Sequence, residues 1–140
     1  MYNALKETCV CLCALMVWAH PARAQSYTCL PDTAERAVIE HDFVVDLVTG
    51  TDTATRNAYK LPSVSASKVS VVTTASVCRQ AGAAYNATVA NGRPPVSRTL
   101  VVIKVGTTRY VVFDPSEHAG EYHMQVVFDS HWSPLIWLGS

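Results

Sequence analysis

Carboxylate and imidazole side chains gather in one short stretch of the sequence, residues 117–131. Beside Glu117, the stretch holds five side chains that could ligate a divalent cation, namely His118, Glu121, His123, Asp129 and His131. Side chains two residues apart share a face of a β-strand, so the candidates within a strand over 121–129 would lie together. Histidine and carboxylate oxygens are common zinc ligands, so this stretch is the candidate metal site of the chain.

The spacing of these residues does not match a known metal or catalytic motif. Neither H-x-H nor H-E-x-x-H occurs, and no serine sits in a G-x-S-x-G turn. Glu117 and Glu121 could form a carboxylate pair for glycoside hydrolysis, but sequence does not give their separation. The polar face of an antiparallel strand carries such residues in any case, and a solvated face is the favoured interpretation. We therefore assign no catalytic residue and no cofactor.

Two tryptophans near the C-terminus are candidates for binding a partner. Trp132 and Trp137 flank Leu135 and Ile136. They could form an exposed apolar patch, or they could close the open edge of a sheet and its core. The second interpretation is favoured.

The first 24 residues have the layout of a signal peptide. A weakly charged start is followed by an apolar run over 10–19, then by Pro21 and the small residues Ala22 and Ala24. The run is too short for a membrane-spanning helix, which needs ~20 residues. We expect cleavage before Gln25 and a secreted or periplasmic protein with no membrane anchor after cleavage; the alternative is a buried N-terminal helix.

Cysteine positions agree with export. Three of the five cysteines, Cys9, Cys11 and Cys13, lie in the predicted signal peptide. The remaining two, Cys29 and Cys78, predict one disulfide in an oxidising compartment. The sequon Asn86-Ala87-Thr88 falls near the end of a predicted helix, and sequence does not decide whether it is used.

Composition excludes several classes of protein. The chain has 140 residues, 49% of them apolar, with 11 basic and 11 acidic side chains. A disordered tail would be less apolar, and a nucleic-acid-binding arm would need clustered Lys and Arg. Residues 25–140 are therefore expected to form a single domain that binds no nucleic acid, with an unknown protein or small ligand as partner.

Apolar periodicity predicts helices first and strands afterwards. Asp32 is expected to cap a short helix, 41–49 to form a strand, and Asp52 to cap a helix over 53–59. The clearest helix spans 75–88 and places Cys78 on its buried stripe. Strands are expected over 68–72, 98–105, 108–114, 121–129 and 134–138.

These elements predict an α+β fold with helices packed on one face of an antiparallel three- to four-stranded meander, held by one disulfide. Cystatin-like and NTF2-like domains share this outline, which by itself carries no function.

Several segments resemble small secreted bacterial proteins that have no assigned activity. The segments are Leu61-Pro62, Val69-Ser70-Val71-Val72-Thr73, Val77-Cys78-Arg79-Gln80-Ala81, Arg109-Tyr110-Val111-Val112-Phe113-Asp114-Pro115, Gly120-Glu121 and Val127-Phe128-Asp129-Ser130-His131-Trp132. The resemblance covers most of residues 27–132 and implies export. We therefore expect an exported, non-enzymatic binding or structural domain, with a metal-dependent or hydrolytic enzyme built on residues 117–131 as the alternative.

Overall fold

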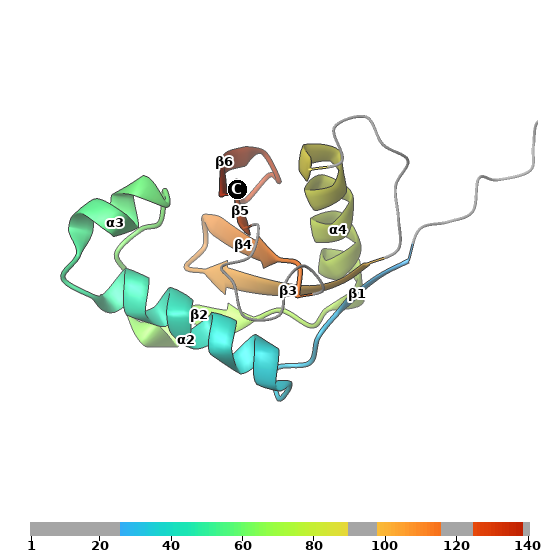
Figure 1. Cartoon of the computed structure of the whole chain (residues 1–140), viewed down its shortest axis with the longest axis horizontal. Coiled ribbons are helices and arrows are strands. Elements are labelled where there is room, and N and C mark those ends of the chain that lie inside the picture. Colours follow the sequence, from blue (N-terminus) through green and yellow to red (C-terminus); the bar gives the residue numbers. More distant parts are fainter. Residues whose placement is uncertain (1–25, 90–97, 116–124, 139–140) are drawn as a thin grey trace, which may run out of the picture.

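The computed structural model describes residues 26–89, 98–115 and 125–138, in which a mixed β-sheet lies between helices (Figure 1). In chain order the elements are β1 (Tyr27–Cys29), α2 (Glu35–Thr49), α3 (Thr53–Ala58), a short 3-10 helix η1 (Ala66–Lys68), β2 (Val69–Val71), α4 (Ala75–Val89), β3 (Arg98–Val105), β4 (Arg109–Phe113), β5 (Gln125–Asp129) and β6 (Pro134–Leu138). The predicted signal peptide lies outside the described residues. No helix in the described ranges is long and apolar enough to cross a membrane.

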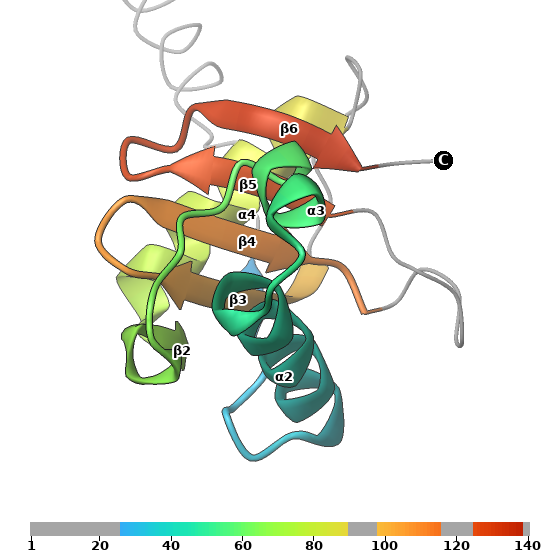
Figure 2. The ribbon, with the colours of Figure 1, turned by 90° about the vertical axis from the view of Figure 1, so that its left-hand side faces the viewer.

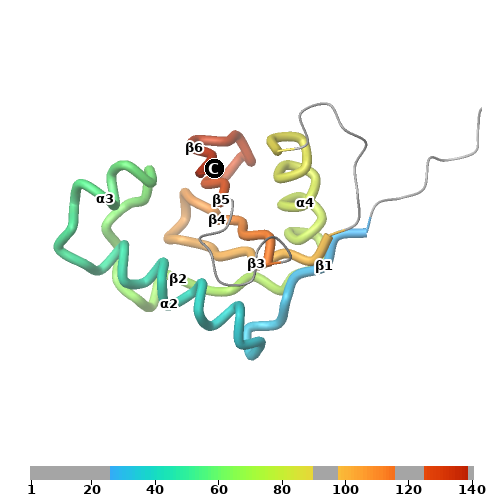
Figure 3. The backbone as a smooth tube through the Cα atoms, in the orientation of Figure 1, coloured from blue at the N-terminus to red at the C-terminus, as the bar shows by residue number. Residues whose placement is uncertain are grey.

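Strand β3 is the centre of the sheet. One of its edges pairs with β4, which is followed outward by β5 and β6 in antiparallel order. Its other edge is shared by two short strands, with β1 parallel to its beginning and β2 antiparallel to its end. Figure 3 shows β1 running beside β3, although the two are far apart in the sequence. The predicted α+β class is confirmed, and β3, β4, β5 and β6 form an antiparallel meander. The sheet as a whole is not purely antiparallel, because β1 pairs parallel to β3 and makes it mixed.

Helices cover both faces of the sheet, which corrects the expectation that they pack on one. In Figure 2, α2 and α3 lie in front of the sheet and α4 lies behind it. Side chains alternate along β3, so Val101 and Ile103 pack on the α2 side, whereas Leu100 and Val102 pack on the α4 side. Strand β5 likewise buries both its faces, so the expected solvated face over 121–129 is absent at Gln125 and Val127.

Helix α2 continues through the stretch expected to form a strand. Its buried residues Ala37, Glu40, Val44 and Val48 recur at helical spacing, and no Gly or Pro interrupts the chain before Gly50. Burial of this stripe against the sheet outweighs the β propensity of the valines. Asp32 does not cap the helix, because Ala34 is the N-cap residue and no side chain caps it.

The other helices agree with the sequence. Asp52 caps α3 and accepts hydrogen bonds from the backbone N–H and the hydroxyl of Thr55, at 3.0 and 2.6 Å. Helix α4 begins at Ala75 and buries Cys78, Ala81 and Tyr85 as the periodicity predicts.

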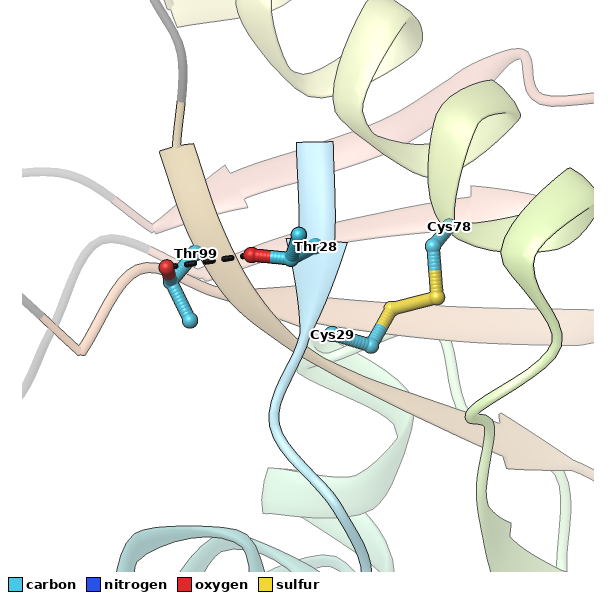
Figure 4. The surroundings of a disulfide bond; sticks show 4 residues. All are labelled: Thr28, Cys29, Cys78 and Thr99. Atoms are coloured by element: carbon cyan, nitrogen blue, oxygen red, sulfur yellow. Dashed lines mark hydrogen bonds between the residues drawn. A yellow bond between two sulfur atoms is a disulfide. The ribbon is translucent and has the colours of Figure 1, made fainter. Parts of the chain in front are cut away.

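The predicted disulfide is confirmed. Cys29 at the end of β1 is bonded to Cys78 in the first turns of α4, with 5.8 Å between their Cα atoms (Figure 4). On the opposite side of β1, the hydroxyls of Thr28 and Thr99 are hydrogen-bonded at 3.2 Å. The three-residue strand β1 is thus held between β3 and α4 by covalent as well as noncovalent contacts.

Gly82 lets α4 pack closely on β1. A Cβ atom at this position would lie 2.0 Å from Cγ of Tyr27 and 2.6 Å from its Cβ. These atoms are close to the Tyr27 backbone, so rotating the ring would not clear the overlap.

Removing the disulfide should destabilise the fold strongly. The two cysteines are 49 residues apart, and a crosslink closing such a loop contributes about 4 kcal/mol by the chain-entropy relation. We expect Cys29→Ala with Cys78→Ala to lower the free energy of unfolding by about that amount in urea titrations. An unchanged free energy would contradict the anchoring role of the bond. As a second check, the unfolded, non-reduced protein should show no free thiol at either position.

Substituting Gly82 should reverse the ordinary helix preference. Alanine normally stabilises a helix interior by about 1 kcal/mol relative to glycine. Here we expect Gly82→Ala to destabilise by roughly 1–2 kcal/mol, because overpacking costs more than the helix gains. In a Tyr27→Ala background, which removes the ring but keeps the Cβ atom, the same substitution should cost less stability but should not become stabilising. The exposed neighbour Ala83 is the control, and Ala83→Gly should show only the propensity loss.

Candidate functional site: the open edge of the sheet

Strand β6 forms one edge of the sheet. It pairs with β5 on one side, and within residues 26–89, 98–115 and 125–138 no strand pairs with its other side. Such an edge presents unpaired backbone groups that another chain can bind. We call β6 with its outward groups the β6 edge.

The hydrogen-bond pattern identifies which backbone groups of β6 point outward. Bonds from Gly106 to Lys68 and from Val72 to Val102 direct the even-numbered residues of β3 toward β2. Along an antiparallel strand, successive residues direct their backbone N–H and C=O groups to opposite sides. When this alternation is followed through the paired residues of β4 and β5, the backbone groups of Val127 point toward Ile136. The N–H and C=O groups of Trp137 therefore face away from the sheet. The alternation does not extend to Leu135, because the register between β5 and β6 shifts between Val127 and Phe128.

The side chains of these same two residues are exposed. Leu135 retains 37% of its accessible surface and Trp137 retains 45%. Trp137 lies opposite Val126, whose side chain packs in the same core cluster as residues of α4. Trp137 is therefore on the α4 side of the sheet. Ile136 points to the other face and packs against the core under α2. No residue of β6 carries a charge.

A tight turn over 129–133 leads into β6. Oδ1 of Asp129 accepts hydrogen bonds from the backbone N–H groups of His131 and Ser133 at 2.8 and 2.9 Å. The backbone N–H of Asp129 donates to the carbonyl of Ser133 at 3.0 Å. The bond from Ser133, together with that from His131, lowers the pKa of Asp129 below its ordinary value, partly opposed by desolvation.

Trp132 occupies this turn in a strained backbone conformation. Its φ angle is +64°, in the left-handed region that bulky side chains rarely adopt. Its indole stacks on the ring of Tyr110 with 4.3 Å between centroids and meets Phe128 edge-on at 5.7 Å. Aromatic packing and the Asp129 hydrogen bonds thus hold the turn that aligns β6.

The two tryptophans therefore differ. Trp132 is half-buried and packs against the core, as the favoured interpretation of the sequence proposed. Trp137 is exposed on the edge strand, in agreement with the alternative. The aspartate turn was not anticipated, although an aspartate followed by serines is a sequence signal for it.

The candidate metal ligands are not assembled in the described part of the chain. His118, Glu121 and His123 lie outside the described residues, as does Glu117. Asp129 serves the turn, and His131 is exposed beside it. No group of three or more His, Cys, Asp or Glu side chains that could hold a metal ion occurs among the described residues.

A buried ion pair lies at the other end of the sheet. Asp114, after β4, is completely buried and paired with Arg98 at the start of β3. The guanidinium also lies 5.7 Å from the centroid of the Tyr85 ring. Burial raises the pKa of Tyr27, which neighbours Arg98 in the sheet, and the positive charge partly offsets this effect. Removing one partner of such a pair leaves a costly buried charge, and the pair links the start of β3 to the residue that follows β4.

The opposite edge of the sheet carries a shallow pocket of about 300 Å³. Asp32, Val38, His41, Ser70 and Val71 line it. Nε2 of His41 donates to the carbonyl of Val69 at 3.1 Å, and Nδ1 lies 3.2 Å from a carboxylate oxygen of Asp42. This imidazole therefore covers an outward backbone group of β2.

The sequon asparagine is inaccessible in the folded chain. Asn86 is 5% exposed within α4, and the hydroxyl of Thr88 donates to the carbonyl of Ala84 at 2.8 Å. Glycosylation needs an exposed side chain, so the folded structure does not offer this site.

Comparison of the chain with protein-family models, curated proteins and solved structures found no match.

Protonation of Asp129 should weaken the turn. A carboxylate with a lowered pKa in the folded state contributes stability above its unfolded pKa of about 3.9, and that contribution disappears as the pH falls through the folded value. Asp129→Asn keeps an acceptor oxygen but does not titrate. We therefore expect the thermal midpoint of the wild type to exceed that of the variant near neutral pH, and the difference to shrink between about pH 5 and pH 3.

The control for this prediction is Asp46→Asn. Asp46 is exposed on α2, and its carboxylate makes no hydrogen bond with the described residues. The difference between wild type and this control should not depend on pH in the same way. A pH-independent difference for Asp129→Asn would show that the charge of Asp129 does not hold the turn.

Proposed function

We propose that the chain is an exported, non-enzymatic domain that binds a protein partner by accepting an extended polypeptide segment along the β6 edge. The observation that carries the proposal is the exposure of Leu135 and Trp137 on an uncharged strand, one side of which pairs with no other strand among the residues that the structure describes. Strand addition uses these features, because backbone hydrogen bonds give affinity and alternate side chains give specificity.

Export to a secreted or periplasmic location is part of this proposal. The layout of residues 1–24 and the resemblance to small secreted bacterial proteins support it. The Cys29–Cys78 disulfide also supports it, because such bonds persist in oxidising compartments. The domain would then meet its partner outside the cytoplasm.

The chemistry of the edge defines the class of partner. Leu135 and Trp137 are the exposed large apolar side chains of β6, so a bound segment would place apolar side chains beside them. Tryptophan is enriched among the residues that dominate binding energy, which makes Trp137 the expected anchor. The alternative of a metal-dependent enzyme gains no support from Asp129, whose Oδ1 is engaged by the turn.

Selection of short linear peptides from a displayed random library tests this proposal. We expect the purified protein to enrich peptides with apolar residues at alternate positions. Trp137→Lys should weaken their binding by roughly tenfold or more, because it removes the anchor and leaves a charge on the edge.

Ile39→Ser is the matched control, because Ile39 is an equally exposed apolar residue on α2. It should leave peptide binding unchanged. Failure to enrich any alternating peptide, or binding that is insensitive to Trp137→Lys, would overturn strand addition at β6.

A further inference from the structure

We infer that the pocket between α2 and β2 is a second binding site, which takes a primary ammonium group carried on a short apolar chain. The pocket lies at the opposite edge of the sheet from β6 and uses no residue of the β6 edge, so the inference goes beyond the proposed function. It follows from the residues that line the pocket, the hydrogen bonds of His41 and the direction of the β2 backbone.

Two elements that pack against each other form most of the pocket. Helix α2 lies beside β2 (Figure 1) and contributes Val38 and His41, which are three residues apart and therefore share a helix face. Strand β2 contributes Ser70 and Val71, and the turn before α2 contributes Asp32. The volume of about 300 Å³ is at the lower end of the range for ligand pockets, which indicates a small ligand or a single side chain.

The polar side chains of the pocket that remain available can accept hydrogen bonds. Asp32 does not cap α2, and its carboxylate makes no hydrogen bond or ion pair with the described residues. The side chain of Ser70 is exposed, and a hydroxyl oxygen accepts as well as donates. The carboxylate gives the pocket a negative charge that is not neutralised within the described chain.

The backbone of β2 supplies a further acceptor. The N–H of Val72 donates to the carbonyl of Val102 on β3, so the alternation along β2 directs the backbone groups of Val71 away from β3. The carbonyl of Val69 points the same way, and Nε2 of His41 covers it. The carbonyl of Val71 is therefore on the side of β2 where the pocket lies.

The charges around the pocket disfavour an anion. Among the described residues that line it there is no lysine or arginine, and His41 is the only one that can become positive. Its Nε2 donates to the carbonyl of Val69, and its Nδ1 lies 3.2 Å from a carboxylate oxygen of Asp42. Any charge on the ring is thus balanced by Asp42, and both nitrogens are turned toward acceptors of the protein. An anionic ligand would find Asp32 and no free cation.

The remaining lining is apolar and defines the rest of the ligand. Val38 is 42% exposed although it lines a pocket, and Val71 is half-buried beside it. An aliphatic chain lying on these side chains would bury apolar surface. An ammonium group has three donors and no acceptor, which suits three separate acceptors better than the planar fork of a guanidinium.

Two sources carry this chemistry, namely a free alkylamine and the side chain of a lysine in another protein. Both have an ammonium on a short aliphatic chain, so the pocket is complementary to either. n-Butylammonium represents the first source, and a glycine-lysine-glycine peptide blocked at both ends represents the second. Whichever binds more tightly identifies the source, and binding of neither would overturn the inference.

Titrations followed by two-dimensional NMR of the ¹⁵N-labelled protein test the site, at constant pH and ionic strength. We expect n-butylammonium to shift the amide signals of Ser70 and Val71 in a saturable way. Butyrate, which has the opposite charge, should cause no saturable shift, and n-butanol should bind more weakly because it lacks the charge. Equal binding of n-butanol and n-butylammonium would overturn the role of the carboxylate.

Substitutions assign the binding to the pocket. Asp32→Asn should raise the Kd for n-butylammonium by roughly threefold to fivefold, as expected for an exposed ion pair. Asp46→Asn is the matched control, because Asp46 is also exposed but does not line the pocket, and it should leave the Kd unchanged. An equal effect of the two substitutions would show that the amine responds only to net charge and would overturn the site.

The apolar wall has its own control. Val38→Ser should weaken the binding of n-butylammonium, whereas Ile39→Ser should not, because Ile39 is equally exposed and does not line the pocket. Binding that is insensitive to Val38→Ser would overturn the assignment of the alkyl chain. Trp137→Lys should leave ammonium binding unchanged, so this site and strand addition at β6 stand or fall separately.

Discussion

Both faces of β3 must be buried at once, and the other layers of the molecule are arranged around that requirement. Val101 and Ile103 need a cover on one side, which α2 supplies, while Leu100 and Val102 need a cover on the other, which α4 supplies. No single helix can reach both faces of a sheet. The chain therefore crosses from one face to the other between α2 and α4, and the short strand β2 forms part of this crossing.

The same requirement explains which parts of the fold the sequence predicts. Two of the confirmed predictions depend on a few neighbouring residues, namely the Asp52 cap and the buried stripe of α4. The disulfide is also confirmed, and it was predicted because only Cys29 and Cys78 lie outside the predicted signal peptide. Helix α2 was wrongly predicted in part, because the valine-rich stretch before Gly50 has strand propensity, and only its contact with β3 selects a helix. Strand β1 has three residues and no apolar pattern, so its parallel pairing with Arg98–Leu100 depends on contacts that a local pattern cannot show.

For the candidate site, the sequence identified the relevant residues but not their separate roles. Both tryptophans stand out by type, yet their exposure depends on the Asp129 turn and on the register shift that follows it in β6. The turn holds Trp132 at positive φ and directs its indole onto Tyr110, so β6 starts in a defined phase. A register shift between Val127 and Phe128 then places Ile136 opposite Val127, and in this register Ile136 packs on the core and Trp137 is exposed. A shift of one residue would exchange the two, and no local pattern in the sequence distinguishes these registers.

Core packing does not account for the apolar residues on the β6 edge. Ile136 packs against the core under α2. The side chains of Leu135 and Trp137 are exposed, so polar residues at these positions would cost no core packing. Edge strands commonly carry charged residues that discourage association, and β6 carries none. At the opposite edge, the imidazole of His41 covers the outward carbonyl of β2. Among the described residues, the β2 edge is therefore partly covered by a side chain, whereas the β6 edge is open and apolar, which makes β6 the side of the sheet where an extended segment can be added.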